Sequence, residues 1–178
     1  FTLLGPTYRT TLPNGGTLNV RHRRGAHLRR NTQLQIHNSI FMDFLDGVVL
    51  DGATTQTNAT NNTLKFKNNI IAGTAPAKVV VAVSPTTYDV ASWFSSNNNT
   101  SQTSSAGLLT APYNMADGSV FTGLDYRPAS SSIALTGADF SDASFTGNLQ
   151  TTYYVDVDGD GYDSGSAVLT VATPPTGY

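Results

Sequence analysis

The stretches TQLQIHNSIF (residues 32–41) and NTLKFKNNII (residues 62–71) decide the fold, because they match position for position at one constant offset. Apolar residues fall on apolar residues, and polar residues fall on polar ones. The matched pairs are Leu34 with Leu64, Gln35 with Lys65, Ile36 with Phe66, His37 with Lys67, Asn38 with Asn68, Ile40 with Ile70 and Phe41 with Ile71; further along, Val49 falls on Val79 and Leu50 on Val80. Matching at a fixed offset indicates an internal repeat.

Within each copy, apolar residues occupy alternate positions, and the alternation changes parity after the Asn. Alternation predicts a strand, and the change of parity predicts a bend. A third strand is expected near GVVL (47–50) and KVVVAV (78–83). Strands that repeat in this way stack about 4.8 Å apart, with equivalent residues above one another. The sequence therefore predicts an all-β fold, a right-handed parallel β-helix with interior stacks of Leu34 on Leu64 and Ile36 on Phe66. The alternative is a β-sandwich or jelly roll.

The Asn at each predicted bend has a structural interpretation. Asn38 would lie above Asn68, and each amide would bond the next while satisfying backbone groups at the bend. We therefore predict a structural ladder made of these two residues.

After residue 84 the strict repeat ends, and the sequence TTYDVASWFSS (86–96) predicts a short helix. Asp89 is a suitable N-cap, and Val90, Trp93 and Phe94 have helical spacing. This helix would cap or flank the solenoid, because an open end exposes unpaired strand edges. The following SSNNNTSQTSSAG (95–107) is predicted to be a polar loop.

Composition favours a protein secreted to the extracellular cell surface. Only 12% of the residues are charged, and the formal net charge is −2. There is no Cys, which excludes disulfides, a thiolate metal site and a thiol nucleophile. No stretch approaches eighteen apolar residues, so we predict no membrane insertion. The chain starts at Phe1 and ends at Tyr178 without a closing strand, and we expect it to belong to a longer polypeptide.

The acidic stretch VDVDGDGYDSG (155–165) predicts a weak Ca²⁺ site. Asp156, Asp158 and Asp160 alternate before a Gly, as the ligands of calcium loops do. Tyr162 would supply a carbonyl oxygen, and Asp163 or Ser164 a further oxygen ligand. The usual acid at the twelfth position is absent, so the site resembles a connector loop more than a helix–loop–helix sensor.

The basic run RHRRGAHLRR (21–30) is a possible contact surface for glycans or other anions. It holds five of the seven arginines: Arg21, Arg23, Arg24, Arg29 and Arg30. The alternative is a solvated outer face of one coil. No aromatic residues interleave and the chain is acidic overall, so nucleic acid is not expected as a partner.

No catalytic residues are predicted. A β-helix glycosidase needs several carboxylates in one groove. Asp43, Asp46 and Asp51 have no acidic counterpart at the matching positions of the second copy, which hold Gly73, Pro76 and Val81. We therefore expect this segment not to be an enzyme. Catalysis elsewhere in a longer parent chain stays open.

Three stretches resemble known families. Residues 34–73, together with LDYRPASSSIALTGADF (124–140), resemble the end coils of right-handed parallel β-helix proteins secreted by Bacteroidota. Residues 152–178 resemble a thrombospondin type 3-like repeat with a DxDxDG calcium loop. The resemblance implies type IX secretion and an adhesive, matrix or extracellular-fibre role.

We therefore expect end coils and a cap over residues 1–148 and a calcium-type linker over residues 149–178. The expected function is a non-catalytic structural or adhesin-like segment stiffened by Ca²⁺. Its expected partners are other modules of the same polypeptide, copies of itself in a fibre, or surface glycans. Two alternatives are the C-terminal cap of a β-helix polysaccharide-degrading enzyme, and a glycan-binding module that uses the arginine run.

Overall fold

The structure is a computed structural model that describes residues 1–7, 17, 19, 21–113, 123–146, 152–154 and 168–170. The chain divides into two compact units, residues 1–139 and residues 140–178. The first unit holds the repeat.

The repeat forms parallel sheets, and strands are the main elements of the fold. In one copy the chain forms three consecutive strands, and in the next copy each strand pairs in parallel with its counterpart. The first copy contains β3 (Gln35–His37), β4 (Ile40–Met42) and β5 (Asp46–Asp51), and the second contains β6 (Lys65–Lys67), β7 (Ile70–Ala72) and β8 (Val80–Val83). A fold of mostly strands with few helices, and the parallel pairing that the repeat predicts, are confirmed.

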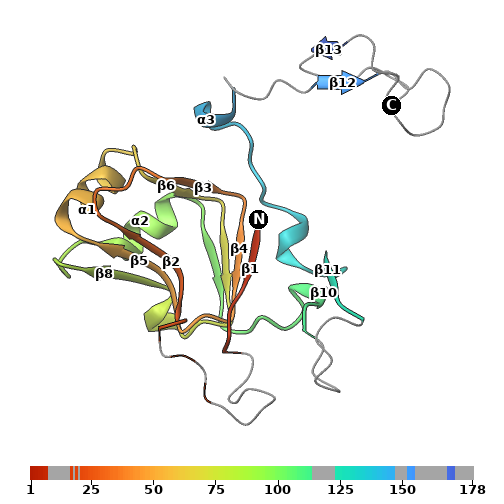
Figure 1. The fold of residues 1–178 in the computed structure, drawn as a ribbon, viewed down its shortest axis with the longest axis horizontal. Coiled ribbons are helices and arrows are strands. Elements are labelled where there is room, and N and C mark those ends of the chain that lie inside the picture. The colour runs from red at the N-terminus through yellow and green to blue at the C-terminus, as the bar shows by residue number, and fades with distance from the viewer. Residues whose placement is uncertain are drawn as a thin grey trace. The chain divides into compact units, whose positions relative to one another are not determined.

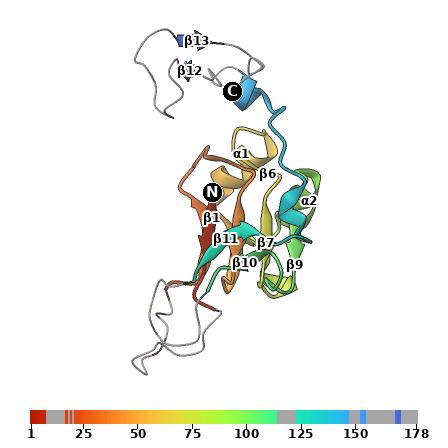
Figure 2. The same cartoon turned by 90° about the vertical axis from the view of Figure 1, so that its right-hand side faces the viewer.

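Three further strands extend these sheets. β1 (Thr2–Leu4) pairs with β4, β2 (Arg24–Arg29) pairs with β5, and β9 (Thr100–Gln102) pairs with β7, all in parallel. The resulting sheet orders are β1-β4-β7-β9, β2-β5-β8 and β3-β6. The three sheets lie on three sides of one interior (Figure 1). Figure 2 shows β1, β7 and β9 running alongside one another in the four-stranded sheet.

The predicted offset is confirmed in two sheets and wrong in the third. The confirmed pairs are Gln35 with Lys65, Ile36 with Phe66, His37 with Lys67, Ile40 with Ile70 and Phe41 with Ile71. In the third sheet the offset is longer, so that Val49 pairs with Val81 and Leu50 with Ala82, not with Val79 and Val80. A 3-10 turn, η1 (Pro76–Lys78), lengthens the corner before β8. The next corner is shorter, and β9 returns to the original offset, with Thr100 beside Ile70.

Aromatic rings fill the centre of the interior. Phe41 and Phe66 have ring centroids 5.4 Å apart, and the Phe66 ring lies 6.2 Å from that of Trp93. Ile36 and Phe66 are both buried and paired, as predicted. The predicted interior stack of Leu34 on Leu64 is wrong, because Leu64 is fully buried but Leu34 is 51% exposed. Leu34 precedes β3, an edge strand of its sheet.

Helix α1 (Ala53–Thr60) fills the corner between β5 and β6 and was not expected from the sequence. It begins after Gly52, whose φ of 99° is a backbone conformation that favours glycine. Its polar residue Gln56 is buried and donates hydrogen bonds from Nε2 to the carbonyls of Val83 and Pro85. The helix is therefore attached through polar contacts, which apolar periodicity does not reveal.

Helix α2 (Val90–Ser96) confirms the predicted capping helix. The backbone N–H of Ser92 donates to Asp89 Oδ1 at 3.0 Å, and this hydrogen bond holds the pKa of the Asp89 carboxyl below its ordinary value. Trp93 and Phe94 are buried against Phe66. In the described part of the chain, no helix has the length and apolar character needed to cross a membrane.

The predicted polar loop over residues 95–107 is wrong in its middle, because β9 forms there and extends the four-stranded sheet. The remaining elements are short. β10 (Leu109–Ala111) pairs antiparallel with β11 (Asp125–Pro128), and η2 (Ile133–Leu135) follows. The second unit contains α3 (Ala143–Thr146), β12 (Thr152–Tyr154) and β13 (Val168–Thr170), the last two paired antiparallel.

Candidate functional site

An asparagine recurs at the bend before β4, β7 and β9 of the four-stranded sheet. Asn38, Asn68 and Asn98 all adopt the left-handed backbone conformation, with φ of 50°, 56° and 54°. Asn tolerates this conformation better than most non-glycine residues. The left-handed residue turns the chain, which is the physical reason for the change of parity in the sequence.

The residue after the second and third of these asparagines points into the interior and forms a ladder. Asn69 Nδ2 donates to Asn99 Oδ1 at 3.1 Å and to the Ile36 carbonyl at 3.2 Å. Asn99 Nδ2 donates in turn to the carbonyls of Phe66 at 2.6 Å and Phe94 at 2.9 Å. The backbone N–H of Asn69 donates to Asn99 Oδ1, and that of Ser39 donates to Asn69 Oδ1, both at 2.9 Å.

The amide ladder therefore lies one residue after the predicted pair Asn38 and Asn68. Asn69 is 1% exposed, whereas Asn38 and Asn68 are only partly buried. The bend places the first Asn outward and the next residue inward. The sequence signal for the true ladder was the pair Asn98 and Asn99, which repeats Asn68 and Asn69 one copy later.

The outer row of asparagines has a different role. Asn38 makes two hydrogen bonds to the backbone of Asp139: Nδ2 donates to its carbonyl at 3.0 Å, and Oδ1 accepts from its N–H at 2.9 Å. Among the described residues, the side-chain amides of Asn68 and Asn98 make no hydrogen bond of this kind. The three residues nevertheless share one backbone conformation.

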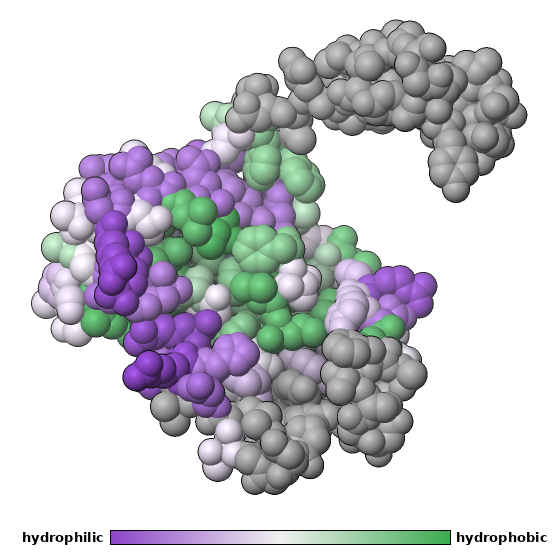
Figure 3. Space-filling model, viewed as in Figure 1, coloured by the Kyte–Doolittle hydropathy of each residue, from purple (hydrophilic) through white to green (hydrophobic). Residues whose placement is uncertain are grey.

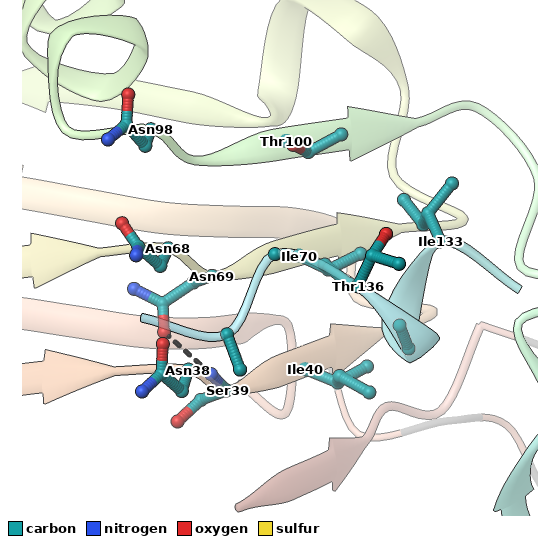
Figure 4. A pocket seen from close by; sticks show the side chains of 13 residues that line it. Asn38, Ser39, Ile40, Asn68, Asn69, Ile70, Asn98, Thr100, Ile133 and Thr136 are labelled. Atoms are coloured by element: carbon teal, nitrogen blue, oxygen red, sulfur yellow. Dashed lines mark hydrogen bonds between the residues drawn. The ribbon is translucent and has the colours of Figure 1, made fainter. Parts of the chain in front are cut away.

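Beside this row lies a cleft of about 260 Å³ between the four-stranded sheet and residues 133–138. Asn68 and Asn98 line one side, Ile40 and Ile70 lie on the strands, and Ile133 lies opposite (Figure 4). No charged side chain of the described residues lines the cleft. Its surface therefore combines amide groups with aliphatic side chains.

Residues 24–29 of the arginine run form the edge strand β2, and two arginines of the run lie beside one carboxylate. Arg23 Nε donates to Asp46 Oδ2 at 2.7 Å and Arg23 Nη2 donates to Oδ1 at 3.3 Å. Arg24 Nε lies 3.7 Å from the same carboxylate. Asp46 is 4% exposed, and its hydrogen bond raises the pKa of the Arg23 guanidinium. The positive charge of Arg23 thus neutralises the buried negative charge of Asp46.

A second carboxylate, Asp51, faces the other end of β2. His27 Nε2 lies 2.9 Å from Asp51 Oδ2, and Arg29 Nε lies 4.0 Å from it. Arg30 has a φ of 57° and makes no ion pair within the described residues, and the Arg21 N–H bonds to Asn19 Oδ1. The contact between His27 and Asp51 is not apparent from the sequence, because these two side chains meet only through the parallel pairing of β2 and β5.

Asp43 lies between β4 and β5, and its carboxylate has two hydrogen-bond partners later in the chain. Its carboxylate is buried and accepts hydrogen bonds from Ser105 Oγ and the Tyr113 hydroxyl, both at 2.8 Å. A Cβ on Gly73 would lie 2.0 Å from Asp43 Oδ1, so only glycine fits there. Asp43 therefore joins the sheet to the segment that follows β9.

The predicted calcium ligands Asp156, Asp158, Asp160, Tyr162 and Asp163 lie outside the described residues. Across the described ranges, no group of three or more His, Cys, Asp or Glu side chains is placed to hold a metal ion.

The chain matches no protein-family model, no curated protein and no solved structure.

Proposed function

We propose that this chain is a non-catalytic structural segment of a secreted cell-surface protein, in which residues 1–139 form the end coils of a parallel β-helix. The supporting observation is the parallel pairing of each strand with its counterpart in the next copy, in three sheets around one interior. Sandwiches and jelly rolls are built from antiparallel strands. The pairing therefore favours a solenoid over these alternatives.

The proposed mechanism is mechanical. Backbone ladders in three sheets, together with the internal Asn69–Asn99 ladder, make the stack stiff. Ca²⁺ bound by the aspartate loop at residues 156–163 would stiffen the connection to the next module. The low share of charged residues supports an extracellular location. Adhesion or fibre formation through a type IX-exported parent is the biological role we propose.

Thermal unfolding, sedimentation and limited proteolysis, each with millimolar Ca²⁺ and then with chelator, test this proposal. We expect Ca²⁺ to compact the chain and protect its C-terminal part from proteolysis. The matched control is D158A/D160A, which removes two proposed ligands and should abolish the difference. Equal sedimentation and proteolysis with Ca²⁺ and chelator would reject the calcium joint. Turnover of a polysaccharide by the purified chain would reject the non-catalytic role.

Binding of anionic glycans by β2 is the second candidate function. Residues 21–30 hold five arginines but lie beside only two carboxylates, Asp46 and Asp51, which leaves a local excess of positive charge. Arg29 Nε lies 4.0 Å from Asp51, and Arg30 makes no ion pair within the described residues, so both remain accessible to an anion. R29A/R30A should therefore weaken binding of a sulfated oligosaccharide at low salt. R23A is a poorer test, because it also leaves Asp46 without its closest partner.

A further inference from the structure

We propose that the cleft beside residues 133–139 binds an extended, uncharged peptide segment, and that Asn68 holds its backbone as Asn38 holds that of Asp139. The model for this interaction is present in the molecule itself. Asn38 donates to the carbonyl and accepts from the N–H of one and the same residue, at 3.0 Å and 2.9 Å. Asn68 has the same backbone conformation one copy further along.

The chemistry of the amide selects a peptide backbone. A carboxamide presents an acceptor and a donor side by side. In an extended chain, the N–H and C=O of one residue point to the same side, so one carboxamide contacts both. The acetamido group of a sugar is a trans amide whose N–H and C=O point in opposite directions. The row of asparagines therefore favours an extended peptide over an N-acetylated glycan.

The spacing of the copies also fits a second extended segment. Equivalent residues on neighbouring parallel strands lie about 4.8 Å apart, and this is also the distance between two paired strands. Since Asn38 and Asn68 occupy equivalent positions before β4 and β7, a segment beside residues 136–139 would meet Asn68 in the same geometry. Asn98 repeats the position once more and is exposed.

The rest of the cleft defines the side chains of the ligand. Ile40, Ile70 and Ile133 offer aliphatic contacts, and Thr136 adds a hydroxyl. Because no charged side chain of the described residues lines the cleft, an acidic or basic side chain would lose water without gaining an ionic partner. The segment that already lies over the sheet here, residues 136–138, is small and uncharged. We therefore expect a ligand with small or aliphatic side chains.

A fluorescent peptide LTGAN, blocked at both ends, tests the proposal. It copies residues 135–138 and replaces the acid at position 139 with its amide. The binding variant is N68G, because glycine keeps the left-handed conformation while removing the carboxamide. The matched control is N61G, at the exposed C-terminal end of α1 outside the cleft. We expect N68G to weaken binding at least tenfold and N61G to leave it unchanged.

A second measurement uses the unaltered protein. The same peptide with an N-methyl group on the backbone nitrogen of its Asn residue lacks the N–H that would donate a hydrogen bond to Asn68 Oδ1. Its affinity should also fall at least tenfold. The proposal is wrong if no LTGAN binding is measured up to several millimolar, or if either change leaves the affinity unaltered. Binding of an N-acetylglucosamine oligosaccharide that N68G abolishes, without binding of the peptide, would also overturn it.

Discussion

The two ends of the strand stack differ in how they cover the interior. At one end, the edge strands β1 and β3 leave Phe1 64% exposed, Leu3 40% exposed and Leu34 51% exposed. At the other end, Trp93 and Phe94 of α2 are each 7% exposed and pack on Phe66. Figure 3, which has the viewpoint of Figure 1, shows apolar side chains gathered over the middle of the face on which β1 lies.

The difference shows what is needed to close a stack of repeats. Residues 95–97, which would form the next strand of the β3-β6 sheet, instead end helix α2 and its cap. Asn99 then joins the helix to the stack, because its amide donates to a carbonyl of each. Within the described residues, the first end has neither an aromatic helix nor such an amide. A repeat buries its apolar face only against a neighbour or a cover.

The largest predicted effect comes from removing the cover. W93A should lower the free energy of unfolding by about 3–5 kcal/mol, because it deletes a buried aromatic side chain that contacts the central Phe66. F1A, at the exposed end, should cost less than about 1 kcal/mol. Urea unfolding of both variants measures the difference. Equal losses would contradict the distinction between the two ends.

Removing the internal amide should have the next largest effect. N99A leaves the Phe66 and Phe94 carbonyls and the Asn69 N–H without their partner, and should cost about 2–3 kcal/mol. The control is N98G, which changes the adjacent exposed residue and keeps its backbone conformation. Hydrogen exchange of the Asn69 amide should rise strongly in N99A and stay unchanged in N98G. Equal exchange in the two variants would show that the Asn99 amide does not hold the stack.

A smaller effect is expected from the N-cap of α2. D89A removes the acceptor for the Ser92 N–H and should lower the melting temperature less than N99A does. Since the folded-state pKa of Asp89 lies below its ordinary value of 3.8, its stabilisation is complete above that pH and is lost as the pH falls through the lowered pKa. The melting temperatures of wild type and D89A should therefore converge in strong acid. A difference that stays constant from neutral to strongly acidic pH would refute this role.

The smallest effect on the unfolding free energy is expected from a substitution at the exposed end, where β1 and β3 lie. L34Q should leave the unfolding free energy within about 0.5 kcal/mol, because Leu34 is half exposed. It should nevertheless reduce self-association at high concentration, since an exposed apolar patch promotes contacts between molecules. Sedimentation velocity measures this. Unchanged association would show that the patch is not a contact surface.

The sequence was sufficient for the strands that follow strict periodicity. The match of residues 32–41 with 62–71 predicted the cross-strand partners in two sheets correctly, because inward residues such as Phe41 and Ile71 must be apolar in every copy. It gave the wrong partners for Val49 and Leu50, because corners change length without any apolar signature. The cap at Asp89 was predictable from local chemistry alone.

The candidate site was predictable only in part. The asparagines at the bends were identified from the sequence. Whether Asn68 or Asn69 points inward, however, depends on the left-handed φ of Asn68, and the sequence alone does not reveal that backbone conformation. The third copy was missed because Thr100 and Ser101 of β9 are polar, whereas Ile70 and Ile71 of β7 are not. The cleft depends on residues 133–139, which bind Asn38 through a contact between positions far apart in the sequence.

The spacing of the copies along the chain also affects when each strand can pair during synthesis. Each parallel pairing closes a loop of one copy, which costs about 3 kcal/mol of chain entropy before the strand pair gains anything. Whole all-β domains dominated by non-local pairings fold in roughly milliseconds to seconds. A ribosome takes roughly 2–6 s to add one copy. Each copy therefore has time to settle on the one before it as it emerges, and α2 closes the stack only after the strands beneath it exist.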